Sequence, residues 1–178
     1  VYYATVSGIS VIDTANNTVV ATVPVGLCPD GVAMHPAGTR LYVANACDDT
    51  VSVIDTANNT VVATVPVGDN PRGVAVNPAG TRVYVTNVQS STDSVLDTAS
   101  NNVVDTVLVD PLPEGVAITP DGTRVYVPTF VSNAIAVIDA STKTVVASVP
   151  GGDGPIAFGQ FIGPVASLGT NLVVNDHQ

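Results

Sequence analysis

The sequence predicts an all-β fold, a β-propeller built from four-stranded blades of about 42 residues. Two observations predict this class: a 42-residue repeat runs along the 178-residue chain, and the apolar residues are mostly Val, Ala and Ile. β-Branched residues favour strands, and a period of about 40–45 residues that holds four short strands is typical of a propeller blade. The 13 Pro and 15 Gly supply turns between many short strands.

The repeat is defined by short motifs that keep the same spacing. Val-Ile-Asp stands at 11–13, 53–55 and 137–139, with Val-Leu-Asp at 95–97. Pro-X-Gly-Val-Ala stands at 29–33, 71–75 and 113–117, and Gly-Thr-Arg at 38–40, 80–82 and 122–124. The chain therefore holds parts of four blades.

One blade is best read from residue 71 onward. We expect strands a (73–77), b (82–87), c (94–97) and d (103–107), ordered from the inner edge of the blade outward. Strands c and d form a hairpin whose best copies read Asp-Thr-Ala-Asn-Asn-Thr, and Asn suits such a turn because it tolerates positive φ.

The two ends of the chain predict how the ring closes. Residues 1–5 resemble strand b at 41–45, whereas 156–162 stand where a fifth strand a is due. We expect 156–162 to supply the missing strand a of blade 1, because this closure removes exposed sheet edges. The expected organisation is a propeller over 1–162, with blade 1 strands b–d in 1–24, blade 2 at 29–66, blade 3 at 71–108 and blade 4 at 113–150. Residues 163–178 are a tail or the start of a further segment.

The charge balance favours some partners over others. The chain has 15 Asp and Glu against 5 Lys and Arg, a net charge of −10. This field repels phosphate backbones and anionic lipid, so we expect no nucleic-acid partner, and no apolar stretch is clean enough for a membrane span. Cations and basic surfaces are better partners.

Repeated charged residues have a structural interpretation. Strand b begins with an Arg opposite the Asp that ends strand c, which predicts three cross-strand ion pairs: Arg40–Asp55, Arg82–Asp97 and Arg124–Asp139. Each Asp also suits hydrogen bonds to its own turn. We therefore expect no catalytic role for these carboxylates.

A second acidic set indicates a binding face. The d–a and b–c connections emerge on one side of the propeller, which we call the top face, and binding residues of repeat scaffolds usually lie on such loops. Carboxylates on these loops allow a weak Ca²⁺ site, although a solvated acidic face explains them as well. The candidates are Asp30, Asp48, Asp49, Asp69, Arg72, Asp93, Asp110, Glu114, Phe130 and Asp153.

Two long stretches resemble the YVTN-family β-propeller repeat. They run over 50–68 and 73–87; Tyr-Val-Thr-Asn stands at 84–87 and varies at 42–45 and 126–129. The resemblance covers about 1–162 and implies a surface-layer or secreted extracellular protein. The family usually has seven blades, so two chains sharing one larger ring is the alternative to closure by one chain.

The two cysteines lie close in the expected blade. Cys28 precedes strand a of blade 2 and Cys47 follows its strand b, so a disulfide is geometrically reasonable, and two free thiols in a metal or redox pair are the alternative. The oxidising surface that the resemblance implies favours the disulfide.

The expected function is a non-catalytic extracellular module for binding or surface assembly. Its expected partner is a protein or glycan at the cell surface, or further copies of itself, and no cofactor is expected apart from weak Ca²⁺. A propeller enzyme of lactonase or lyase type and an accessory subunit of a secreted redox complex are the alternatives.

Overall fold

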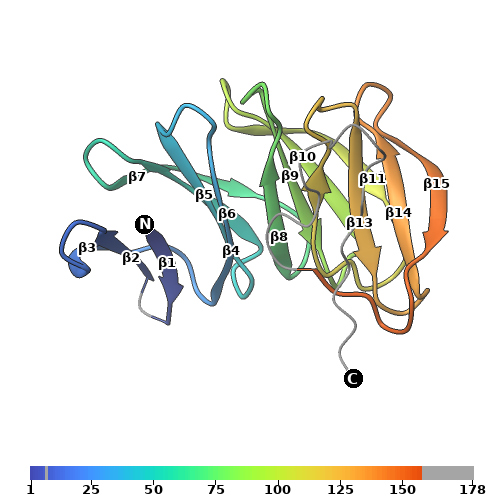
Figure 1. The fold of residues 1–178 in the computed structure, drawn as a ribbon, viewed down its shortest axis with the longest axis horizontal. Helices are drawn as coiled ribbons and strands as arrows, with labels where there is room; N and C mark the ends of the chain where they lie inside the picture. Colours follow the sequence, from blue (N-terminus) through green and yellow to red (C-terminus); the bar gives the residue numbers. More distant parts are fainter. Residues whose placement is uncertain (7, 158–178) are drawn as a thin grey trace.

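The structure is a computed structural model that describes residues 1–6 and 8–157. Its fifteen strands form four antiparallel sheets, which are blades 1 to 4 (Figure 1). Blade 1 holds β1 (Tyr2–Thr5), β2 (Gly8–Asp13) and β3 (Thr18–Val23), and blade 2 holds β4 (Pro29–Met34), β5 (Arg40–Asn45), β6 (Thr50–Asp55) and β7 (Thr60–Pro66). Blade 3 holds β8 (Pro71–Val76), β9 (Arg82–Asn87), β10 (Thr92–Asp97) and β11 (Asn102–Leu108), and blade 4 holds β12 (Ala117–Ile118), β13 (Arg124–Thr129), β14 (Ala134–Asp139) and β15 (Thr144–Pro150). The predicted all-β architecture of propeller blades is confirmed.

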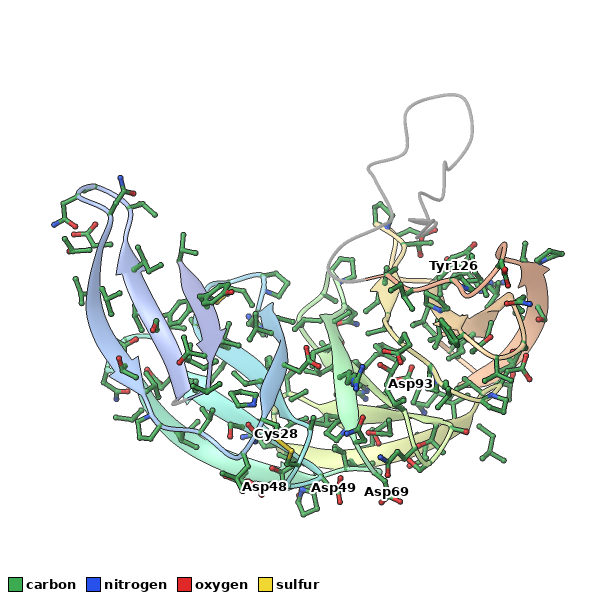
Figure 2. All side chains as sticks on the ribbon, turned by 90° about the horizontal axis from the view of Figure 1, so that it is seen from below. Cys28, Asp48, Asp49, Asp69, Asp93 and Tyr126 are labelled. Atoms are coloured by element: carbon green, nitrogen blue, oxygen red, sulfur yellow. A yellow bond between two sulfur atoms is a disulfide. The ribbon has the colours of Figure 1, made fainter. Side chains whose placement is uncertain are left out.

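Strand order within the blades follows the repeat. In blades 2 to 4 the four strands pair in sequence order, from inner strand a to outer strand d. The blades follow one another along an open arc, with blade 1 at one end and blade 4 at the other (Figure 2). Strand c of blade 3 begins at Thr92, two residues earlier than the sequence predicted.

The c–d hairpins have the local chemistry that the motif predicts. Asn17, Asn59 and Asn101 adopt positive φ in three hairpins, and Lys143 takes that position in blade 4. Every outer strand then contains a bulge. In blade 2, Val53 and Ile54 of β6 pair with Ala63 and Val61 of β7, so the outer strand β7 has one residue more than its partner at this point. A bulge twists an edge strand so that it pairs poorly with strands of other molecules. The outer strands of these blades are therefore protected from edge-to-edge aggregation although they carry few charges.

The hydrophobic core lies between blades rather than within them. Between blades 2 and 3, Tyr42, Val53 and Val65 of the first blade pack against Val83 and Leu96 of the second. Equivalent clusters join blade 1 to blade 2 and blade 3 to blade 4. The sheets of blades 2 and 3 therefore each pack between two neighbours, as stacked repeats require.

Glycines allow the inner strands to approach closely. A Cβ on Gly31 would stand 1.9 Å from the Arg72 carbonyl oxygen, and one on Gly115 would stand 1.8 Å from the Ala157 carbonyl oxygen. Side chains are excluded at such distances, so Gly fits these positions. Ala157 thus lies beside the inner strand of blade 4, at the place of a fifth strand a.

Most of the predicted closing strand falls outside the described residues. Residues 156 and 157 are described, whereas 158–162 are not, and neither are 163–178. Closure of blade 1 by 156–162 therefore stays a prediction.

Candidate functional site

The top face is formed by the connections that enter strand a and leave strand b. In blades 2, 3 and 4 the same backbone hydrogen bond joins these two connections, from Ala46 N to Cys28 O, from Val88 N to Asn70 O and from Phe130 N to Leu112 O, each 3.0 Å long. Cys28, Asp48, Asp49 and Asp69 gather along one edge of the molecule (Figure 2). The repeat therefore brings the loop acids of neighbouring blades together.

A disulfide braces this face in blade 2. The structure joins Cys28 to Cys47, with 5.4 Å between the two Cα atoms. Cys28 has φ 53°, in the left-handed region. The cross-link ties strand a to strand b where both reach the top face, as the sequence predicted.

Two of the candidate acids hold the loops in place. The Asp48 Oδ2 atom accepts a hydrogen bond from the Leu27 backbone N–H at 2.7 Å. The Asp49 Oδ1 atom accepts one from the Asn70 backbone N–H at 2.8 Å, which links blade 2 to blade 3. Both carboxylates are already bonded to backbone donors, so their first role is structural.

Three other acids stand free on the surface. Asp69, Asp110 and Asp153 are exposed, and among residues 1–6 and 8–157 no hydrogen bond or ion pair engages their carboxylates. Phe130, also on this face, is 46% exposed and lies over Gly154. These three carboxylates and the Phe130 ring are the groups of the top face available to a partner.

Charged residues at one repeat position form a network at the start of the inner strands. The Arg72 Nη1 atom lies 3.1 Å from Glu114 Oε2, and its Nε atom lies 3.7 Å from Asp30 Oδ2. Asp30 lies in blade 2, Arg72 in blade 3 and Glu114 in blade 4, so the network joins three blades. Arg72 is shared by two carboxylates, and the network keeps a net negative charge.

Asp93 is not part of the top face, which corrects the prediction from the sequence. It lies within β10, is 0% exposed, and neither carboxyl oxygen has a hydrogen-bond partner among the described residues. Burial raises the pKa of Asp93 to about 8. The repeat places Val51 and Ile135 at its position, so alignment of the blades is the signal that could have revealed this burial.

The repeated Asp residues have the structural role expected of them. Arg40 pairs with Asp55, Arg82 Nη1 lies 2.5 Å from Asp97 Oδ2, and Arg124 Nη1 lies 2.7 Å from Asp139 Oδ2. The other oxygen of each Asp accepts backbone N–H groups of its hairpin. These bonds lower the pKa of Asp55 and Asp97, chiefly through the Ala57 and Ser100 backbone donors. All three predicted ion pairs are confirmed.

The concave side of the arc carries an apolar groove. Its volume is about 370 Å³, and inner strands β4, β8 and β12 line it with residues such as Met34, Val76 and Ile118. Within the described part of the chain, no three His, Cys, Asp or Glu side chains are grouped closely enough to hold a metal ion. The described residues also contain no helix long and apolar enough to cross a membrane.

The fold and the top face together define a β-propeller-type repeat domain that presents an acidic loop surface. Comparison with protein families matches residues 4–153 to the choice-of-anchor I domain. The chain belongs to this family, which points to a surface-anchored or secreted module. The intramolecular disulfide fits an extracellular or cell-surface protein. Membership in the YVTN family specifically stays a prediction.

Solved structures share the architecture. The chain is similar to Kuenenia stuttgartiensis hydrazine synthase, with 29% identity, a TM-score of 0.77, and coverage of 80% of this chain and 43% of that one. It is also similar in fold to a functionally unknown protein from Desulfotomaculum acetoxidans, with 20% identity, a TM-score of 0.72, and coverage of 83% of this chain and 50% of that one. The chain thus spans no more than half the length of either. Among curated proteins, no sequence matches.

Proposed function

We propose that the protein is a non-catalytic binding module, secreted or held at the cell surface, that recognises a basic partner through its top face. The observation that carries this proposal is the set of free carboxylates of Asp69, Asp110 and Asp153 on a face stiffened by the disulfide. Free carboxylates on a rigid scaffold attract cationic groups without a cost for reordering the loops.

The surrounding charges support the same partner. Arg72 is the base of this face, and two carboxylates neutralise it, so the field at the loops stays negative. Phe130 adds an exposed apolar ring, which suits a basic protein segment because aromatic faces attract cations. Family membership supports a cell-surface setting for such contacts.

Cosedimentation with cell envelopes of the producing organism tests the proposal. We expect binding at low salt that weakens as salt rises, because the screening length falls from about 10 Å at 0.1 M to about 3 Å at 1 M. A triple Asp→Asn variant at Asp69, Asp110 and Asp153 is expected to bind about tenfold more weakly, since each exposed charge contributes roughly 0.5 kcal/mol.

The matched control carries the same change away from the top face. Asn in place of Asp13, Asp105 and Asp121 removes equal charge, and at Asp13 and Asp121 an amide oxygen still accepts the turn hydrogen bonds. The proposal requires this control to bind like the wild type. Equal loss in both triple variants would show that only net charge matters, and unchanged binding in the first would show that the top face is not the site.

The likeness to hydrazine synthase supports a second candidate. On that likeness, the chain is an accessory subunit of a secreted redox complex. Purification of the protein from its own cells tests this, and a partner that carries a visible cofactor absorbance would favour it over the first proposal.

A further inference from the structure

The c–d hairpins of blades 1 and 2 carry a motif that the hairpins of blades 3 and 4 lack. Each reads Asn-Asn-Thr, at 16–18 in blade 1 and at 58–60 in blade 2. Asn-X-Ser/Thr, with X other than Pro, is the acceptor sequence (the sequon) for N-linked glycans. Blade 3 has Ser-Asn-Asn at 100–102 and blade 4 has Thr-Lys-Thr at 142–144, so neither has an Asn at the first position.

Comparison of the four hairpins shows which residue of the motif the turn needs. The middle residue adopts positive φ in every blade, at Asn17, Asn59, Asn101 and Lys143. Blades 3 and 4 make the same turn with Ser or Thr in place of the first Asn. The turn therefore does not require Asn16 and Asn58, and their presence needs a further reason.

Hydrogen bonds occupy one end of each sequon amide and leave the other end free. The Asn16 Oδ1 atom accepts the Thr18 backbone N–H at 3.1 Å and the Thr18 hydroxyl at 2.7 Å. The Asn58 Oδ1 atom accepts the same two groups of Thr60, at 3.2 and 2.6 Å. Both Asn residues are exposed, and within 1–6 and 8–157 no group accepts a hydrogen bond from either Nδ2 atom. Nδ2 is the atom to which an N-linked glycan attaches.

The two sequons lie at the end of the blades opposite the top face. The top face is formed by d–a and b–c connections, whereas residues 16 and 58 lie in c–d hairpins. Strands c and d are antiparallel, so a hairpin stands one strand length away from the start of c and the end of d. A bulky group at these positions leaves the free carboxylates of the top face uncovered.

We propose that Asn16 and Asn58 are N-glycosylation sites, modified after export of the protein. In this reaction Nδ2 attacks the anomeric carbon of a sugar that is carried on a lipid diphosphate. The bond from that carbon to the diphosphate oxygen breaks, the bond to Nδ2 forms, the nitrogen loses one proton, and the lipid diphosphate leaves. This inference goes beyond the proposed function, because it needs the exported location and not the binding role of the top face.

Mass spectrometry of the protein purified from its own cells is the test. After reduction of the Cys28–Cys47 disulfide, trypsin cleaves after Arg40 and after Arg72, so the two sequons fall on separate peptides. Each peptide is expected to be heavier than its sequence by a whole number of sugar residues. Electron-transfer fragmentation is expected to place the added mass on the Asn of each sequon.

Two substitutions at one position separate the sequon from the fold of the hairpin. Thr60→Val removes the sequon hydroxyl, and Val suits this first residue of β7 because β-branched residues favour strands. Peptide 41–72 is then expected at its sequence mass, while the glycan that remains on Asn16 shows that the variant is folded and exported. Thr60→Ser is the matched control, since it keeps the hydroxyl and is expected to keep the glycan.

Three results would overturn the proposal. The first is native protein in which both peptides have their sequence mass. The second is added mass on Thr18 or Thr60, which would identify an O-linked modification instead. The third is a modified peptide 41–72 in Thr60→Val. The variant is expected to bind cell envelopes like the wild type, so failure of glycosylation and failure of binding by the top face are separate results.

Discussion

Replacement of Asp93 by Val is expected to stabilise the protein at neutral pH. The side chain is 0% exposed, has no hydrogen-bond partner among the described residues, and stands where blades 2 and 4 have Val51 and Ile135. Burial raises its pKa from 3.8 to about 8. Burial and then the charge of Asp93 also raise the pKa of nearby Tyr84, to about 12.

The sign of the effect follows from the direction of the shift. A carboxyl whose pKa is raised on folding binds a proton more tightly in the folded state. Its stabilising contribution to the free energy of unfolding is therefore fully present below pH 4 and is lost as pH rises through 8. At pH 7 the shift corresponds to at most about 4 kcal/mol, at about 1.4 kcal/mol per pKa unit. Asp93→Val removes this cost and adds apolar contact, so we expect a gain of roughly 2–4 kcal/mol at pH 7.

Urea unfolding followed by circular dichroism at several pH values measures this gain. Asp55 and Asp97 have lowered pKa values, so their pH dependence has the opposite sign. Their contribution to the stability of the folded protein is lost as pH falls. The difference between wild type and Asp93→Asn isolates Asp93, because the two differ at one titrating group. That difference should grow from pH 4 to pH 8. A difference that is flat with pH, or an Asp93→Val variant less stable than wild type, would refute the reasoning.

Three further changes test the architecture. Cys28→Ser with Cys47→Ser is expected to cost about 3 kcal/mol in urea unfolding, the entropy of opening a loop of this length, and a reduced wild type should match it. Gly73→Ala is expected to cost roughly 1–3 kcal/mol, because the added Cβ would stand 2.8 Å from the Gly115 Cα atom, and a cost near zero would contradict this close approach. Asp97→Ala is expected to destabilise the protein more than Arg82→Met does, because it removes the turn hydrogen bonds as well as the exposed ion pair, and the reverse order would show that the ion pair dominates.

The periodic features were predictable because the same motifs recur at the same spacing in each repeat. The 42-residue spacing fixed the four blades and the a-to-d strand order, and the pairing of Arg82 with Asp97 followed from antiparallel register. The adjacency of strands a and b made a Cys28–Cys47 disulfide geometrically reasonable, and the extracellular setting that the family resemblance implied favoured it over two free thiols. Each of these depends on local pairing within one blade.

The features that the sequence did not reveal depend on contacts between blades. Asp93 reads as a polar loop residue, yet its register in β10 turns it inward, and only the positions of Val51 and Ile135 signal this. The link from Arg72 to Glu114 required the spacing of two inner strands. One missed feature lies within a single blade: blade 4 has Pro128 where blade 3 has Thr86, whose hydroxyl accepts a hydrogen bond from the Gly73 N–H, and its inner strand β12 has two residues.

The location and thiol state of the protein in its own cells test the account most directly. Fractionation should find the protein outside the cytoplasm, and alkylation under denaturing conditions should find Cys28 and Cys47 unreactive, because they are joined. A cytoplasmic protein with two reactive thiols would contradict both the surface location and the function proposed from it.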